Sequence, residues 1–217
     1  MAREIETKCI HLEETEGALN HFGAMAYPIY QSATYAHPGV GQSTGYDYSR
    51  LQNPTREHLE KTVASLENGI DALAFSSGMA AITLMMELFK PGDHLIVDAD
   101  LYGGSIRLFN HVSEKNRIEF SSVDCHNENV AAYIRENTKA VYIETPTNPM
   151  MNVTDIKALA EITKKHNILL IVDNTFLSPY FQNPLNLGVD IVVHSGTKYL
   201  GGHNDTLAGF LVTNRED

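Results

Sequence analysis

Seven short apolar runs alternate with longer polar stretches, and this alternation constrains the fold more than any other feature of the sequence. The runs lie at 72–75, 94–98, 118–123, 140–144, 168–173, 190–194 and 208–213. Short apolar runs bounded by polar turns predict strands, and the stretches at 79–89, 104–113, 127–137 and 154–166 predict helices between them. The sequence therefore indicates an α/β domain with a mostly parallel sheet and helices on both of its faces.

Residues 1–53 differ from the rest of the chain. Much of this segment is rich in Tyr, Gly, Ser and Pro and has no sustained period. We expect an extended arm that lies on another surface, for which a neighbouring subunit is a natural candidate. Asn53 and Pro54 then suit the cap and first position of a helix. The main domain is accordingly expected to run from residue 54 to residue 217.

The charge and cysteine content disfavours several classes of protein. The formal net charge is -11, whereas nucleic-acid-binding and membrane-surface proteins usually carry a basic patch. Cys9 and Cys125 are far apart and lack the spacing of a metal site or a disulfide framework. There is no apolar signal core at the start and no run of membrane-spanning length. We expect a cytoplasmic protein that binds neither nucleic acid nor membrane.

Ligands of parallel sheets bind at the carboxyl ends of the strands, so the residues that follow each strand are the candidates for a site. Ser77, Gly78 and Met79 follow the strand at 72–75 and open a helix. Backbone N–H groups at such a helix start can bind an anion. An ordinary serine-capped helix would use the same residues.

Two further strand ends carry groups suited to a flat ligand. Tyr102 precedes two glycines after the strand at 94–98, and it could stack on a ring or simply pack at the surface. Asn148 lies between two prolines after the strand at 140–144. A loop stiffened in this way is a good support for one hydrogen-bonding amide, although an Asn-Pro turn needs no ligand.

The last two strand ends carry opposite charges. Asp173 ends an almost wholly apolar strand, where a carboxylate is costly to bury unless it is paired with a cation or with donors. Lys198 follows the strand at 190–194 in "HSGTKYLGGHND" and is flanked by the hydroxyls of Ser195 and Thr197. A lysine nucleophile, an acid for a ring nitrogen, a stacking ring and a phosphate site are together what pyridoxal phosphate requires.

The sequence closely resembles the Cys/Met-metabolism, or trans-sulfuration, family of pyridoxal-phosphate enzymes. The matching stretches are "YDYSRLQNPTR", "AFSSGMAAI", "DLYGGSIRLF", "ETPTNPMM", "VDNTF" and "HSGTKYLGGHND", and the resemblance covers the chain from about residue 24 onward. It implies an aspartate-aminotransferase-like (fold type I) large domain. It also implies that pyridoxal 5'-phosphate is the cofactor.

The resemblance implies a role for each matching residue. Lys198 would form the Schiff base and move protons, Asp173 would pair with the pyridinium nitrogen, and Tyr102 would stack on the ring. Lys198 and Tyr102 are therefore the expected catalytic residues. The other residues assigned to cofactor binding are Ser77, Gly78, Met79, Ser195 and Thr197 on the phosphate side and Asn148 near the ring oxygen. Tyr48 and Arg50 match residues that reach the phosphate of a neighbouring subunit, which implies a homodimer or homotetramer.

The resemblance is greatest to bacterial cystathionine γ-synthases and the closely similar O-acetylhomoserine thiol-lyases. It favours the γ-synthase reaction, in which cysteine replaces the acyloxy group of an O-acylhomoserine to give cystathionine. Cystathionine β- and γ-lyases stay open as alternatives. Methionine γ-lyases typically carry a cysteine at the position of Gly104, which weakens that alternative. Members of the family are nearly twice as long as this chain, and their C-terminal domain supplies the arginine that binds the substrate carboxylate. We therefore expect the large domain to be incomplete and the small domain to be absent, so a non-catalytic, cofactor-binding remnant is the alternative from another class.

Two other functions fit the sequence poorly. The glycines of "GVGQSTG" at 39–45 lack the spacing of a nicotinamide-binding loop and do not follow a strand. His194, His203 and Asp205 could suggest a metal site, but turn histidines are more often solvated or hydrogen-bonded. We expect no metal ion.

Overall fold

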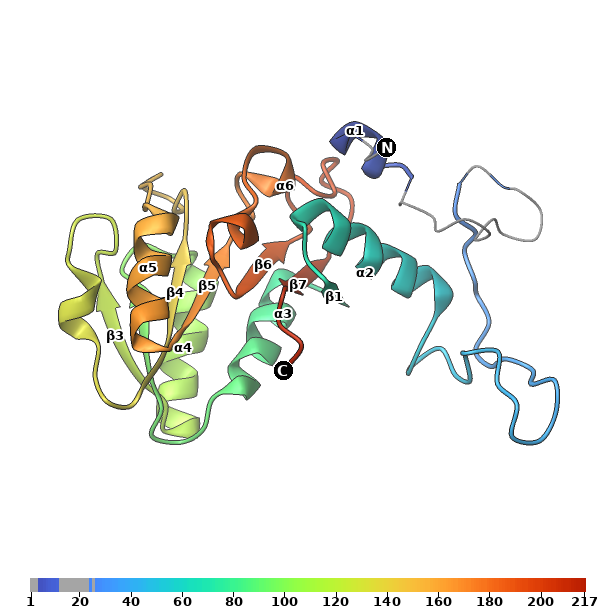
Figure 1. Ribbon diagram of the computed structural model, residues 1–217, viewed down its shortest axis with the longest axis horizontal. Helices are drawn as coiled ribbons and strands as arrows, with labels where there is room; N and C mark the ends of the chain where they lie inside the picture. The colour runs from blue at the N-terminus through green and yellow to red at the C-terminus, as the bar shows by residue number, and fades with distance from the viewer. Residues whose placement is uncertain (1–3, 12–23, 25) are drawn as a thin grey trace.

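The computed structural model describes residues 4–11, 24 and 26–217 of the chain (Figure 1). Its helices are α1 (Ile5–Lys8), α2 (Pro54–Glu67), α3 (Gly78–Met85), α4 (Gly103–Asn116), α5 (Ile156–His166) and α6 (Ser178–Phe181). Three 3₁₀ turns lie at Met86–Leu88, Val130–Tyr133 and Pro184–Leu187. None of the helices in this part of the chain is long and apolar enough to cross a membrane.

Seven strands form one sheet in the order β1-β7-β6-β5-β4-β2-β3. They are β1 (Asp71–Phe75), β2 (His94–Asp98), β3 (Glu119–Val123), β4 (Thr138–Glu144), β5 (Leu169–Asp173), β6 (Ile191–Ser195) and β7 (Gly209–Thr213). Strand β7 is antiparallel to both of its neighbours, β1 and β6, and the other pairings are parallel. The prediction of a mostly parallel sheet is confirmed, and each apolar run coincides with a strand to within two residues.

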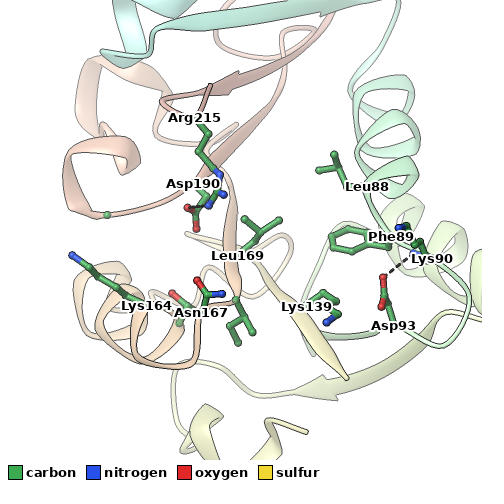
Figure 2. A pocket seen from close by; sticks show the side chains of 13 residues that line it. Leu88, Phe89, Lys90, Asp93, Lys139, Lys164, Asn167, Leu169, Asp190 and Arg215 are labelled. Atoms are coloured by element: carbon green, nitrogen blue, oxygen red, sulfur yellow. Dashed lines mark hydrogen bonds and ion pairs between the residues drawn. The ribbon is translucent and has the colours of Figure 1, made fainter. Parts of the chain in front are cut away.

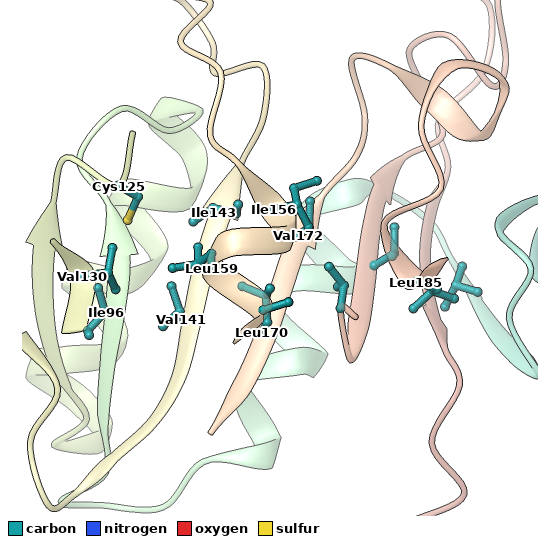
Figure 3. Close-up of a cluster of buried hydrophobic side chains, with 14 of the residues drawn as sticks. Ile96, Cys125, Val130, Val141, Ile143, Ile156, Leu159, Leu170, Val172 and Leu185 are labelled. Atoms are coloured by element: carbon teal, nitrogen blue, oxygen red, sulfur yellow. The ribbon is translucent and has the colours of Figure 1, made fainter. Parts of the chain in front are cut away.

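Helices cover both faces of the sheet. On one face α2, α5 and the 3₁₀ turn at 184–187 pack on strand residues such as Val141 and Val172 (Figure 3). On the other face α3 and α4 pack on residues such as Tyr142 and Ile171. Because side chains alternate along a strand, neighbouring residues of β4 belong to different clusters, which is why buried parallel strands are apolar throughout.

The prediction of a helix at 127–137 is wrong. Only a 3₁₀ turn forms there, at Val130–Tyr133. The Asn129 side chain accepts the N–H of Ala131 at 3.2 Å, and the Asp124 side chain binds the backbone and side-chain amides of Asn127. Short polar side chains that bond the nearby backbone in this way compete with helix formation.

The described part of the predicted arm contains helix α1 and, at 26–53, only isolated bridges and turns. The rest of the 1–53 segment lies outside the described residues. Asn53 caps α2 by accepting the N–H of Thr55 at 2.9 Å, and its amide donates to the carbonyl of Tyr30 at 3.1 Å. Segment 26–53 is thus tied to the start of α2, and it extends beyond that end of the helix, away from the sheet (Figure 1).

Candidate active site

A cavity of about 170 Å³ lies at the carboxyl ends of β4, β5 and β6 and at the amino-terminal end of α3. It is lined by Ser77, Gly78, Met79, Ile82, Tyr102, Glu144, Asn148, Asp173, Thr175, Phe176, Ser195, Thr197, Lys198 and Leu207. Nine of the eleven residues predicted to bind the cofactor are in this group. The structure therefore brings together residues that are up to about 120 positions apart in the sequence.

A larger cavity, of about 910 Å³, lies at the opposite edge of the sheet (Figure 2). Its wall includes Lys139 and Leu169 near the amino ends of β4 and β5, together with Asp190 and Arg215, which form an ion pair at 3.1 Å. It contains none of the predicted site residues. We place the candidate site in the smaller cavity because the chemically suited groups converge there.

The anion-binding side of the small cavity forms where α3 begins beside the end of β6. Ser77 caps α3 by accepting the N–H of Ala80 at 3.1 Å. The absence of a side chain at Gly78 permits the close approach, since a Cβ there would lie 2.8 Å from the Cβ of Ser195. The N–H groups of Gly78 and Met79, the first two residues of the helix, have no partners within it, so they are available to an anion beside the Ser195 hydroxyl.

Asp173 is buried, with 7% of its surface exposed, at the end of β5. Its Oδ1 accepts the backbone N–H of Thr175 at 3.0 Å and the Thr175 hydroxyl at 2.5 Å, and its Oδ2 accepts the hydroxyl of Tyr142 at 3.3 Å. Burial raises the pKa of Asp173 above its ordinary value, while the bonds from Thr175 oppose that shift. A cation reaching this carboxylate would favour its charged form.

Lys198 lies in the turn that follows β6, and its side chain is exposed to the cavity. The turn is held by backbone bonds, since the N–H of Lys198 donates to the carbonyl of Ser195 at 3.1 Å and its carbonyl accepts from Gly202 at 2.8 Å. Thr197 is fixed separately: its hydroxyl donates to the carbonyl of Ala208 at 3.3 Å and accepts the Ala208 N–H at 3.2 Å. Hydrogen bonds therefore fix the backbone of Lys198, while its side-chain amine stays accessible from the cavity.

Tyr102 lies at the start of α4, and its ring is folded against that helix. A Cβ at Gly104 would lie 2.4 Å from the Tyr102 ring and 3.0 Å from the sulfur of Met79. Glycine at this position therefore leaves the space that the ring occupies. A cysteine there could not share this arrangement without moving the ring.

Sequence reasoning missed two polar residues of this site, Glu144 and Thr175. Glu144, with 4% of its surface exposed, accepts the backbone N–H of Tyr102 at 2.8 Å, and burial followed by the charge of Asp173 raises its pKa to about 8. Thr175 joins two strand ends, because its hydroxyl also accepts the N–H of Ser195 at 2.8 Å. Each is visible in the sequence: Glu144 is a strand's own last residue, and Thr175 lies two positions after the acid.

A buried polar pair supports the site from the other face of the sheet. Glu67 of α2 meets His194 Nε2 at 2.5 Å and accepts from the amide of Asn174 at 2.8 Å. His194 directly precedes Ser195, and Asn174 directly follows Asp173. The bonds from Glu67 to these two residues therefore fix the ends of both strands. His203 instead bonds the carbonyl of Gly201, and the described residues hold no group of three possible metal ligands.

Tyr48 and Arg50 do not line this chain's cavity. Both are exposed in the arm, where the guanidinium of Arg50 lies 5.1 Å from the centre of the Tyr48 ring. Figure 1 shows this segment beyond the amino-terminal end of α2. The structure thus separates these two predicted residues from the other nine.

The residues present fit pyridoxal phosphate. A buried carboxylate suits a cationic ring nitrogen, an exposed lysine suits the aldehyde, and a helix start with adjacent hydroxyls suits the phosphate. Asp173 is the most telling of these, because a carboxylate this deeply buried faces a cavity that is otherwise mostly apolar and hydroxylic. A cationic ring would offset the cost of that burial.

Comparisons with known proteins agree with this fit. Cystathionine γ-synthase/O-acetylhomoserine (thiol)-lyase of Bacillus subtilis is 52% identical over 217 residues, which are 100% of this chain and 58% of that protein. Cystathionine γ-lyase of the same organism is 56% identical over 192 residues, 88% of this chain and 51% of that protein. The chain thus spans little more than half the length of these curated relatives.

Solved structures of related enzymes share the fold. Cystathionine γ-lyase from Lactobacillus plantarum, complexed with L-serine, superposes with a TM-score of 0.91 at 46% identity and covers 98% of this chain and 55% of that one. Cystathionine γ-synthase from Xanthomonas oryzae, in complex with aminoacrylate and cysteine, gives a TM-score of 0.91 at 37% identity, over 100% of this chain and 56% of that one. The family model for Cys/Met metabolism PLP-dependent enzymes matches residues 6–217. The chain belongs to the Cys/Met metabolism family of pyridoxal-phosphate-dependent enzymes.

Proposed function

We propose that this protein is a trans-sulfuration enzyme, and specifically a cystathionine γ-synthase that joins cysteine to an O-acylhomoserine. The observation that carries the proposal is the convergence of Lys198 and Asp173 on one cavity beside the start of α3. The Bacillus subtilis synthase/thiol-lyase, which matches all 217 residues, supports the choice of reaction.

Each residue of the cavity has a distinct task in this proposal. Lys198 would hold the cofactor covalently until the substrate amine takes its place, and the freed lysine amine would then take the proton from the substrate α-carbon. Asp173 would hold the ring nitrogen in its protonated form, and Tyr102 would pack on the ring. Thr175 keeps Asp173 oriented through two hydrogen bonds.

The remaining cofactor-binding residues hold the phosphate and the ring oxygen. The first turn of α3 and two hydroxyls would donate hydrogen bonds to the phosphate, and the amide of Asn148 would donate one to the ring oxygen. The residues assigned to the phosphate are Ser77, Gly78, Met79, Ser195 and Thr197, to which the neighbouring subunit adds its own arm.

The proposed reaction replaces one substituent at the substrate γ-carbon. The cofactor supplies an electron sink that stabilises negative charge at the α-carbon. Lys198 removes the α-proton and returns a proton later. Loss of a second proton, from the β-carbon, would let the acyloxy group leave the γ-carbon as a carboxylate. Cysteine, having given up its thiol proton, would then form the new C–S bond at the γ-carbon, and the β- and α-carbons would each regain a proton to give cystathionine.

A carbon–sulfur lyase is the second candidate, because the Bacillus subtilis cystathionine γ-lyase is 56% identical over 88% of this chain. The same cavity residues serve both reactions, so the two are separated by assay. Purified protein that also contains the second domain of the longer relatives is given an O-acylhomoserine with cysteine and, separately, cystathionine alone. Cystathionine formation at the higher kcat/KM supports the synthase, whereas faster keto-acid release from cystathionine contradicts it.

The substrate carboxylate needs a cation that the described cavity does not supply. Lys198 is the one positively charged residue among the described residues that line the cavity, and no arginine is there. The resemblance assigns this task to the second domain of longer relatives. Turnover without that second domain would contradict this part of the proposal. Cofactor binding that gives no turnover even when the domain is supplied would favour the alternative of a non-catalytic, cofactor-binding protein.

We also propose that the protein is at least a homodimer, with Tyr48 and Arg50 of one subunit completing the phosphate site of the other. Their exposure in an arm tied to the start of α2 supports this, since neither lines its own cavity. A homotetramer would be a pair of such dimers. We place the protein in the cytoplasm, in keeping with the two free thiols of Cys9 and Cys125, and with small amino acids rather than nucleic acids or membranes as its ligands.

A further inference from the structure

Two loops deliver Tyr102 and Asn148 to the cavity, and they follow strands that lie side by side. Strand β2 ends at Asp98, before the loop that leads to Tyr102, and β4 ends at Glu144, before the loop that carries Asn148. The two strands pair in parallel, so both loops leave the same edge of the sheet. Their relative position decides where the tyrosine ring and the amide lie.

Each loop is bonded to the other by a carboxylate. Glu144, at the end of β4, accepts the backbone N–H of Tyr102 from the β2 loop at 2.8 Å. Conversely, Asp100 in the β2 loop accepts two hydrogen bonds from the β4 loop. One comes from the hydroxyl of Thr147, and the other comes from the N–H of Met150 at 3.3 Å. The exchange is reciprocal, since each strand end contributes one acid and receives donors from the other.

One group of each bond pair, Glu144 in the first and Thr147 in the second, is protected from water. Glu144 has 4% of its surface exposed and Thr147 has none. Thr147 also closes its own loop, because its N–H donates to the carbonyl of Asn152 at 3.0 Å and its hydroxyl accepts the N–H of Asn152 at 2.9 Å. Asn148 directly follows Thr147, so the bond to Asp100 fixes the residue next to it.

We propose that Glu144 and Asp100 are positioning residues that lock the two loops together and thereby hold the Tyr102 ring and the Asn148 amide in place for the cofactor. This inference rests on the proposed function, since it assigns the two acids a task toward the same cofactor. It goes further in giving that task to residues that do not contact the reacting atoms. The acids act as hydrogen-bond acceptors rather than as proton donors or as ligands of a cation.

The chemistry of Glu144 makes the proposal testable by a conservative change. Burial keeps the Glu144 carboxyl largely protonated near neutral pH. Glutamine has the same shape as a protonated glutamate, with one acceptor oxygen and one donor group. The E144Q variant therefore keeps the bond to the Tyr102 N–H, and E144A removes it.

The test compares E144A, E144Q and D100A with a control at the other end of the sheet. Asp190 accepts the N–H of Leu170 at 2.8 Å, so D190A removes a similar carboxylate–backbone bond at the opposite edge of the sheet from the candidate site. Three quantities are measured: the Kd for pyridoxal phosphate, the visible circular dichroism of the bound cofactor, and hydrogen exchange of the Tyr102 amide in cofactor-free protein. Urea unfolding records stability.

We expect E144A to weaken cofactor binding about tenfold, to change the dichroism and to speed exchange of the Tyr102 amide, because a hydrogen bond to a buried acceptor is lost. D100A shifts the same quantities in the same direction and carries the test if E144A does not fold. E144Q stays close to the wild type in all three, and D190A loses stability without changing the dichroism.

Two results would overturn the inference. One is a Kd and dichroism in E144A and D100A equal to those of the wild type. The other is an E144Q variant as impaired as E144A, which would show that charge and not the acceptor matters. If the wild-type protein itself binds no pyridoxal phosphate, the proposed function fails instead, and exchange of the Tyr102 amide still tests the lock.

Discussion

Buried acids at the ends of β2, β4 and β5 dominate the electrostatics of the site. Asp98, Glu144 and Asp173 are each less than 10% exposed, and burial is the first cause of the raised pKa of all three. Asp173 has three hydrogen-bond donors, whereas the Asp98 Oδ2 has no partner among the described residues. Burying carboxyl groups in this way lowers the stability of the folded protein, and carboxyl groups with such raised pKa values are typical of functional sites.

At this scale the sequence revealed the residues that differ from their surroundings. Lys198 and Asp173 could be predicted because a charge after an apolar strand is conspicuous. Glu144 and Thr175 are visible at the strand ends, but their tasks could not be predicted, because those tasks depend on neighbours brought by other strands, such as the Tyr102 N–H and the Ser195 N–H. Hydrogen bonds across a sheet follow from strand order, which the sequence pattern does not contain.

The pKa of Glu144 predicts how stability depends on pH. It rises from 4.5 to about 8 in the folded state, through burial and then the charges of Asp173, Asp100 and Asp98. The folded state thus binds more protons than the unfolded state between these values, so the free energy of unfolding falls as pH rises through that window. Replacing Glu144 by Gln removes this contribution.

Between pH 5 and pH 8 the free energy of unfolding of the wild type should therefore fall, relative to that of E144Q, by up to about 4 kcal/mol when both proteins are free of cofactor. Urea unfolding at a series of pH values measures the difference. Asp98 and Asp173 contribute slopes of the same sign to both proteins, so only the difference is assigned to Glu144. Parallel curves for the two proteins would contradict the assignment.

At the scale of elements, the contact between α3 and the end of β6 is what creates the anion-binding side of the site. Strands β6 and β7 and helix α3 pack together, and Gly78 sets the separation between the helix start and Ser195. Strand positions were predictable because buried parallel strands are continuous apolar runs. The short turn at Val130–Tyr133 was not, since side chains of Asp124 and Asn129 compete for the backbone.

Replacing Gly78 by Ala tests this contact. The new Cβ would lie 2.8 Å from the Ser195 Cβ and 2.9 Å from its Cα, so the helix start must move away from the strand end. We expect the Kd for pyridoxal phosphate to rise roughly tenfold, the scale of a modest packing clash.

Gly103→Ala is the matched control, because Gly103 opens α4 and a Cβ there meets nothing within 4 Å. Fluorescence titration with pyridoxal phosphate measures both variants. Equal affinities in G78A and G103A would mean that the α3–β6 contact does not shape the phosphate site.

At the scale of the whole molecule, the chain divides its predicted site residues between two places. Nine line one cavity at the carboxyl edge of the sheet, and Tyr48 and Arg50 lie in the arm beyond α2. The sequence could place an arm by its composition but not its direction. That direction depends on bonds such as those from the Asn53 amide to the Tyr30 carbonyl and from the Tyr30 N–H to the Thr55 hydroxyl.

Subunit mixing tests whether the arm serves a neighbour. K198A lacks the lysine of its own cavity, and R50A lacks the arm residue that it would lend. Both variants are made in protein that also contains the second domain of the longer relatives, because turnover is expected only there. In a mixed dimer one site has both Lys198 and Arg50, so co-expression of the two inactive variants should restore roughly a quarter of the wild-type activity. An inactive mixture, with mixed dimers verified by differential tagging, would show that each chain completes its own site.

The central claim is that Lys198 binds pyridoxal phosphate covalently in the cavity that also contains Asp173. The most direct test is borohydride reduction of cofactor-loaded protein, followed by peptide mass spectrometry to locate the lysine that carries the pyridoxyl group. The account predicts one modified lysine, Lys198, and no modification of the cavity in K198A. A pyridoxyl group on another lysine, or an unchanged degree of modification in K198A, would contradict it.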